Sequence, residues 1–158
     1  MLRALDDQLG VVPHGRAGLS YDLRKEHFDR IDAVDFTLAH DDGLRMEGLH
    51  LADVVLVGVS RVAKSVTCSY LAARGIRAVD VPLVPGQKVP AELLKLDAKK
   101  VVGLTMNAKR LVSIREARLR RLSNAQVPTY VGDQQIIEEL RDARAAMSRH
   151  KWPCIDVS

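Results

Sequence analysis

The chain has 158 residues, 47% of them apolar, which suits one domain spanning residues 1–158 around a single hydrophobic core. No apolar run approaches the roughly 18 residues that span a bilayer, and acids within the first seven residues argue against a signal peptide, so we expect a cytoplasmic protein. Net charge is +4, but aromatic residues are only 4% and basic residues concentrate between Lys99 and Arg121, which favours a local anion site over a nucleic-acid partner.

The first third of the chain carries helix and turn signals. A short helix is expected over residues 2–9, followed by a stretch up to residue 20 with little regular structure. A helix is predicted over residues 23–34, with four residues on one shared face: Leu23, His27, Ile31 and Val34. Residues 36–38 are expected to form a short strand, and residues 41–43 a turn.

The remaining chain alternates between predicted strands and helices. Strands are expected over residues 52–58, 78–83, 100–105 and 154–157. Helices are expected over residues 65–73, 91–96, 107–122 and 133–149, the third with Asn107 as its N-cap. The strand over 52–58 is apolar without alternation, as expected for a strand covered on both faces. Strands that alternate with helices form βαβ units, so the predicted fold class is α/β, with a three-layer parallel sheet.

A phosphate-binding loop is predicted where the first strand meets the following helix. The spacing is G-x-x-x-x-G-K-[ST], and the residues expected to surround the nucleotide phosphates are Gly58, Val59, Ser60, Arg61, Val62, Ala63, Lys64 and Ser65. Backbone N–H groups of such a turn, together with the positive end of the helix, attract an anion. Lys64 would bring a cation to the terminal phosphates, and the Ser65 hydroxyl would ligate the Mg²⁺ that bridges them.

Ala63 replaces the second glycine of the pattern. If this position requires a left-handed backbone, its Cβ costs about 1–2 kcal/mol. A different turn, with Arg61 making an extra phosphate contact, is an alternative. The competing interpretation is that Lys64 and Arg61 decorate an ordinary strand-to-helix turn.

Carboxylates supply the next candidates. Asp41 and Asp42 are candidate catalytic residues, either as Mg²⁺ ligands or as the base that takes a hydroxyl proton, and the competing interpretation is a simple turn. The neighbouring His40 is as well explained by packing. Asp80 lies between apolar strand residues, and it is either at an edge position or a carboxylate that faces magnesium. Thr105 is either an ordinary residue at a strand end or a ligand contact.

Two arginines are candidate contacts to a phosphate or to a partner protein. At helical spacing, Arg115 and Arg118 share a stripe with Leu111 and Leu122, so the face that two leucines would bury also carries two charges. Either their stems extend to the surface or they pair with an anion, because an unpaired buried charge is costly. Arg110 is expected to be an ordinary solvated charge.

The cysteines indicate neither a metal site nor a disulfide framework. Cys68 falls within an apolar helix pattern and Cys154 beside a predicted strand. Both are expected to be buried, reduced thiols.

Segments in order along nearly the whole chain carry a family resemblance, including His-Asp-Asp-Gly at 40–43 and Pro-Leu-Val-Pro-Gly at 82–86. The segments cover residues 30–43, 52–61, 70–76, 81–86, 102–105, 110–115, 118–119 and 152–157. They resemble the pyruvate, phosphate dikinase regulatory proteins, which form one family with the phosphoenolpyruvate synthase regulatory proteins. The family differs in having a hydroxyl residue where Ala63 stands, threonine at Ser65 and proline at Val66.

The resemblance implies two activities. Members use ADP to phosphorylate a threonine of the target dikinase or synthase, which inactivates it, and use inorganic phosphate to remove that group, releasing pyrophosphate. It therefore implies ADP as the nucleotide, inorganic phosphate as co-substrate, Mg²⁺, and pyruvate, phosphate dikinase as partner, with phosphoenolpyruvate synthase as the alternative. The family's nucleotide loop falls on residues 58–65.

Other functions remain as hypotheses. The family has a substantial N-terminal portion before Leu2 and a helix after Val157. One alternative is therefore a catalytically impaired nucleotide-binding remnant. Sheet edges left exposed without these elements would also favour a homodimer. A general P-loop NTPase is a third, disfavoured because no second strand ending in a carboxylate for Mg²⁺ is recognised.

Overall fold

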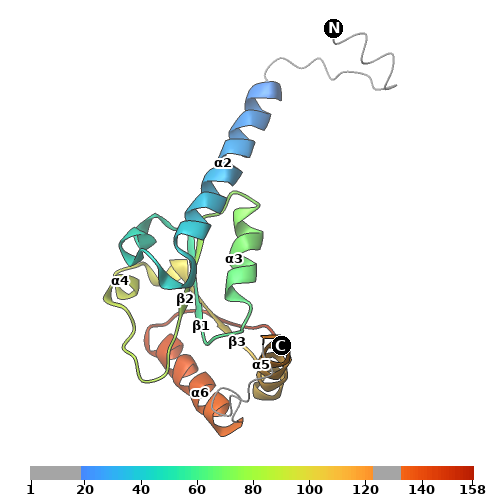
Figure 1. The fold of residues 1–158 in the computed structure, drawn as a ribbon. Coiled ribbons are helices and arrows are strands. Elements are labelled where there is room, and N and C mark those ends of the chain that lie inside the picture. Colours follow the sequence, from blue (N-terminus) through green and yellow to red (C-terminus); the bar gives the residue numbers. More distant parts are fainter. Residues whose placement is uncertain (1–18, 123–132) are drawn as a thin grey trace.

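The computed structural model describes the backbone of residues 19–122 and 133–158, so the predicted helix over residues 2–9 lies outside the described part of the chain. Within these ranges, one parallel sheet has the strand order β2-β1-β3-β4 (Figure 1). Its strands are β1 (Val54–Gly58), β2 (Ala78–Pro82), β3 (Val101–Thr105) and β4 (Cys154–Asp156).

Helices connect and cover these strands. The α-helices with described bounds are α2 (Leu19–Ala39), α3 (Lys64–Ala72), α4 (Ala91–Leu94), α5 (Ala108–Leu122) and α6 (Asp133–Arg149). Short 3₁₀ turns are η1 (Asp41–Gly43), η2 (Met46–Leu51) and η3 (Ala98–Lys100). The four strands predicted from residue 52 onward and the helices from α3 onward are confirmed, with their ends shifted by at most two residues. Asn107 caps α5 as expected, because its side-chain oxygen accepts a hydrogen bond from the Lys109 N–H at 2.9 Å.

The register of the strands shows how the helices are layered. Leu56 of β1 is in register with Asp80, whose side chain accepts a hydrogen bond from α3. The next residue, Val57, is in register with Gly103 of β3, where an added Cβ would meet Met147 of α6. Neighbouring residues of a strand point to opposite faces. α3 and α6 therefore cover opposite faces, and the predicted three-layer α/β arrangement is confirmed.

The predicted strand over residues 36–38 is wrong, because α2 continues through it. The ring of Phe36 stacks on His40 one turn later, with centroids 4.1 Å apart, and Thr37 Oγ1 donates a 2.7 Å hydrogen bond to the carbonyl of Ala78. A strand would have pointed neighbouring side chains to opposite sides. These contacts join the end of α2 to the edge of the sheet and bring the chain to η1.

The apolar spacing along this helix does not mark the face that is buried. α2 extends well beyond the sheet in Figure 1, so its earlier turns have no sheet to pack against. His27 and Ile31 are exposed, whereas Ala33, Thr37 and His40 are buried near the sheet. Contact with the sheet, rather than apolar spacing along the helix, decides which face is buried.

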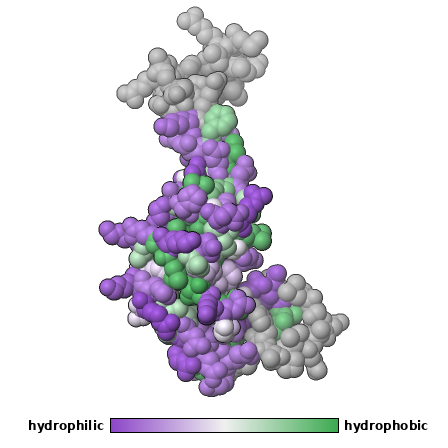
Figure 2. Space-filling model, turned by 90° about the vertical axis from the view of Figure 1, so that its left-hand side faces the viewer, coloured by the Kyte–Doolittle hydropathy of each residue, from purple (hydrophilic) through white to green (hydrophobic). Residues whose placement is uncertain are grey.

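The core lies between the sheet and its helices. Val55, Val57, Val79 and Val101 of the strands are fully buried, and Leu111 of α5 and Ile136 of α6 join the same cluster. Hydrophilic side chains cover most of the face shown in Figure 2, with apolar side chains gathered towards its middle. Among the described residues, no helix combines the length and apolar character that crossing a bilayer requires.

Candidate functional site

The loop from β1 to α3, predicted to bind phosphate, contains two residues with a left-handed backbone. β1 ends at Gly58 and α3 begins at Lys64, and between them Arg61 and Ala63 adopt left-handed backbone angles, with φ of 74° and 63°. Left-handed residues within a turn direct successive N–H groups to one side and form an anion-binding concavity. The N-terminal N–H groups of α3 open next to it.

Lys64 lies within this loop, and its charge is withdrawn from bulk water. Its side chain is only 6% exposed, and Nζ donates a 3.0 Å hydrogen bond to the carbonyl of Val59. The bond folds the side chain back across the loop while it still lines the adjoining cleft. The predicted contact of this ammonium group with a phosphate stays a prediction.

Ala63 adopts a left-handed backbone, and this is the conformation in which its Cβ was expected to cause strain. Ala63→Gly should raise the free energy of unfolding by about 0.5–1 kcal/mol, because the Cβ cost of about 1–2 kcal/mol exceeds the entropy cost of a new glycine. Thermal unfolding of the two proteins measures this change. The matched control is Ala73→Gly at the right-handed C-cap of α3, where φ is −60° and glycine should lower stability. Equal losses in both variants would contradict the argument.

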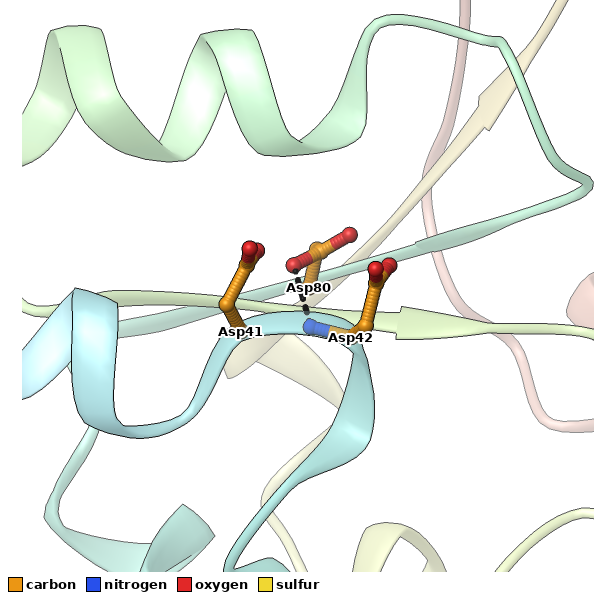
Figure 3. Close-up of side chains that lie close together, drawn as sticks. All are labelled: Asp41, Asp42 and Asp80. Carbon is orange, nitrogen blue, oxygen red and sulfur yellow. Dashed lines mark hydrogen bonds between the residues drawn. The ribbon is translucent and has the colours of Figure 1, made fainter.

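Three carboxylates gather beside the loop (Figure 3). Asp41 and Asp42 come from η1 and Asp80 from the middle of β2, and one oxygen of each lies within 4.8 Å of the others. The Asp42 N–H donates to Asp80 Oδ1 at 3.1 Å, and the Ser65 hydroxyl donates to Asp80 Oδ2 at 3.1 Å. Asp80 therefore joins η1 to the first turn of α3.

The crowded charges raise the pKa of Asp41. Hydrogen bonding to Asp80 is the main cause, followed by burial and by repulsion from Asp80 and Asp42, and together they raise the pKa of Asp41 to about 6. The carboxyl group thus holds its proton closer to neutral pH than an ordinary aspartate does.

This shift predicts how stability depends on pH. Between the ordinary pKa of 3.8 and about 6, the folded protein binds more protons at Asp41 than the unfolded chain does. Stabilisation from Asp41 is therefore full below pH 3.8 and is lost as pH rises through about 6. Urea unfolding of wild type and Asp41→Asn across this range should show wild type losing stability relative to the variant. A difference that does not change with pH would contradict the shift.

A cleft lies between the loop and α5. Its volume is about 490 Å³, and its lining includes the loop residues Ser60, Arg61, Ala63, Lys64 and Ser65. The opposite side and rim are formed by Asp42, Val66, Met106, Arg110, Ile114 and Val157. Cationic side chains thus enter from both walls, and one carboxylate lies at the rim. This arrangement fits an anionic ligand with a hydroxyl or metal partner.

The two predicted anion-binding arginines have different environments. Arg115 is 1% exposed and pairs with Glu139 of α6 at 2.6 Å, so the anion that it contacts is a carboxylate of its own chain. Arg118 is exposed, in agreement with the alternative that its side chain extends to the surface. The side chain of Leu122 lies outside the described residues. A direct role for either arginine at a phosphate or partner stays a prediction.

Sequence reasoning missed two residues of the site. Asp80 was left open, although an acid flanked by Val79 and Val81 in a strand covered on both faces needs polar partners, and that signal was available. It is a strand carboxylate, although it lies in the middle of β2 and not at the strand end where a general P-loop NTPase was expected to carry one. Arg110, expected to be an ordinary solvated charge, is exposed but lines the cleft.

The remaining candidates lie elsewhere or serve packing. Thr105 is buried at the end of β3, where its hydroxyl accepts a 2.9 Å hydrogen bond from Arg144 Nε. His40 is buried, with Nδ1 2.7 Å from the carbonyl of Phe36. Cys68 is buried as expected, and burial is the main cause that raises the pKa of its thiol to about 12. Cys154 is exposed, contrary to expectation, because β4 forms an edge of the sheet.

Comparison with known proteins places this site in a family. Residues 1–158 match the kinase/pyrophosphorylase family. The chain is 43% identical over 159 residues to a protein of Bradyrhizobium diazoefficiens and 42% identical over 158 residues to one of Caulobacter vibrioides. It is 45% identical over 158 residues to one of Paramagnetospirillum magneticum. Each relative is named, provisionally, a pyruvate, phosphate dikinase regulatory protein.

The coverage of these matches is unequal. Each alignment covers 100% of this chain but 57%, 50% and 51% of the three relatives, so the chain spans about half the length of the curated relatives it matches. The family match nevertheless extends over every residue, including the loop, the carboxylate cluster and the cleft. The chain belongs to the kinase/pyrophosphorylase family.

Proposed function

We propose that this protein is a bifunctional serine/threonine kinase and phosphorylase acting on pyruvate, phosphate dikinase. In one direction the terminal phosphoryl group of ADP passes to a threonine hydroxyl of the dikinase, leaving AMP and inactivating the target. In the other, inorganic phosphate takes the phosphoryl group from the phosphothreonine, which releases pyrophosphate and restores the hydroxyl. Both reactions move one phosphoryl group between oxygens, so one cleft serves both.

The observation that carries this proposal is the loop with Lys64 beside the carboxylate cluster. Phosphoryl transfer depends mainly on positioning and on stabilising the charge of the transferred group. Loop N–H groups and the Lys64 ammonium supply that stabilisation. Asp42 lines the cleft, and we assign to its carboxylate the acceptance of the threonine proton.

The chemistry of the carboxylate cluster fits Mg²⁺, which prefers hard oxygen ligands. Asp80, Asp41 and the Ser65 hydroxyl would hold the ion, and Asp80 already orients Ser65 through a 3.1 Å hydrogen bond. A bound Mg²⁺ would supply charge neutralisation between the phosphates. The raised pKa of Asp41 means that metal binding must displace its proton.

The target is assigned from the relatives and from sequence. The three relatives described above carry names that refer to pyruvate, phosphate dikinase, and the segment over residues 36–43 resembles regulators of the dikinase more than those of the synthase. Phosphoenolpyruvate synthase is the alternative target. Both candidate targets present a threonine as the acceptor, so the chemistry required of the cleft is the same.

The experiment that tests the function is a transfer assay with purified components. ADP labelled in its terminal phosphate should label a threonine of pyruvate, phosphate dikinase and inactivate the dikinase. Subsequent addition of unlabelled inorganic phosphate should release the label as pyrophosphate. Phosphoenolpyruvate synthase in a parallel reaction identifies the preferred target. Transfer to neither enzyme, from a chain that is folded by circular dichroism, would refute the proposal.

One observation favours a second candidate, a nucleotide-binding protein without catalysis. Ala63 carries a Cβ at a left-handed position of the loop. This candidate predicts that ADP binds, measured by isothermal titration calorimetry, while the transfer assay stays at background. Binding together with transfer excludes it.

A further inference from the structure

Arg115 lies behind the phosphate loop rather than inside the cleft. We infer that Arg115 is a positioning residue, which holds the carbonyl of Ser60 and thereby aims the next backbone N–H of the loop at the bound phosphate. This inference rests on the proposed function, because it assigns a role within the same nucleotide site. It differs from the expectation of a direct phosphate contact, since Arg115 would act through the backbone.

The contacts of Arg115 join three parts of the fold. Its Nη2 donates to Glu139 Oε2 at 2.6 Å and to the carbonyl oxygen of Ser60 at 3.2 Å. The side chain is 1% exposed, whereas Glu139 is 14% exposed. Arg115 does not line the cleft, but its neighbour Ile114 on α5 does. The guanidinium therefore reaches the loop from the side that faces α6.

Peptide geometry carries the effect from the carbonyl to the cleft. The C=O of Ser60 and the N–H of Arg61 belong to one planar peptide group, and in a trans peptide they point in opposite directions. Within the described residues no peptide bond is cis. A hydrogen bond that draws the carbonyl towards Arg115 therefore turns the Arg61 N–H away from Arg115. Ser60 and Arg61 both line the cleft, where that N–H would meet an oxyanion.

The charge at this position indicates a positioning role rather than a stabilising one. Replacing a buried ion pair with apolar residues of similar volume is often neutral or stabilising, so a pair kept only for stability has little advantage. A planar guanidinium can hold two acceptors in fixed directions, which an apolar side chain cannot do. Holding Ser60 and Glu139 together uses this property.

Two variants separate positioning from stability. The double variant Arg115→Met with Glu139→Met removes both charges and leaves no unpaired ion, so its melting temperature should stay near that of wild type. Its dissociation constant for ADP should rise about tenfold, because a charged hydrogen bond to the loop is lost. Glu139→Gln removes the charge partner but leaves Arg115 able to bind Ser60. It should lower the melting temperature while the ADP dissociation constant changes less than about threefold.

A matched control and a second measurement complete the test. Arg120→Met with Glu116→Met removes an exposed ion pair from the same helix, with atoms 3.6 Å apart, and should change neither quantity. Hydrogen exchange of the 58–64 loop should accelerate in the Arg115 and Glu139 double variant, while exchange in β1 stays as in wild type.

Each outcome decides one claim. If wild type binds no ADP, the proposed function fails, and loop exchange alone then tests the positioning claim. If ADP affinity and melting temperature fall together in both variants, Arg115 is merely structural. If the double variant changes neither ADP affinity nor loop exchange, the inference is overturned.

Discussion

Lys64→Met should lower phosphoryl transfer from ADP at least about 100-fold, the scale of losing one preorganised charge at a reacting oxyanion. Methionine keeps the apolar stem but removes the ammonium group that now donates to the Val59 carbonyl. Isothermal titration calorimetry with ADP and initial rates of dikinase labelling give the effects on binding and on transfer. The larger effect is expected on transfer, because charge on the phosphoryl oxygens and the leaving group develops during the reaction.

The matched control for this variant is Lys99→Met. Lys99 is exposed in η3, at the amino end of β3 and away from the carboxyl ends of the strands where the cleft lies. It should transfer at the wild-type rate. Transfer by Lys64→Met at the wild-type rate would remove the loop from the mechanism, even if the protein proved to be a kinase.

Gly58→Ala should be the most destabilising substitution in the loop, lowering the free energy of unfolding by about 3 kcal/mol or more. A Cβ at Gly58 would collide with the carbonyl oxygen of Leu104 on β3 and would lie 3.0 Å from Val62 Cγ2. The φ of 157° is also one that residues with a Cβ rarely adopt. Because Leu104 O belongs to the backbone of a central strand, it cannot move aside as a side chain can. Urea unfolding measures the loss.

Gly86→Ala separates the collision from the backbone angle. Gly86 has a positive φ of 75°, but an added Cβ would have no atom within 4 Å. It should therefore cost only about 1–2 kcal/mol, the penalty for a left-handed residue with a Cβ. Equal losses for the two variants would show that close packing against β3 does not explain the glycine at the end of β1.

The fold was largely predictable because its strands are apolar and each is separated from the next by a helical pattern. Sequence spacing also located the phosphate loop, since Gly58 and Lys64 lie at the two ends of the turn. α2 was harder to predict. Phe36 and Thr37 have high strand propensity, but the hydrogen bond of Thr37 to the Ala78 carbonyl and that of His40 to the Phe36 carbonyl one turn earlier hold the segment in a helix.

The site was less predictable because it is assembled across the sheet. Asp80 reaches Asp41 and Asp42 because the end of α2 lies against β2, where Thr37 bonds the Ala78 carbonyl and η1 follows. Arg110 lines the cleft because of the orientation of α5, and no local pattern encodes that orientation. Arg115 appeared as a charge in need of an anion, but its partner, Glu139, lies on a different helix.

The composition of the cleft also determines when it can exist during synthesis. Its lining begins at Asp42 and ends at Val157, and the Val157 N–H donates a 2.9 Å hydrogen bond to the carbonyl of Thr105 directly after β4. A nascent chain on the ribosome therefore lacks part of this wall until residues around Val157 have left the exit tunnel. Nucleotide would capture the chain only after that moment, so ligand capture would report that synthesis has passed β4.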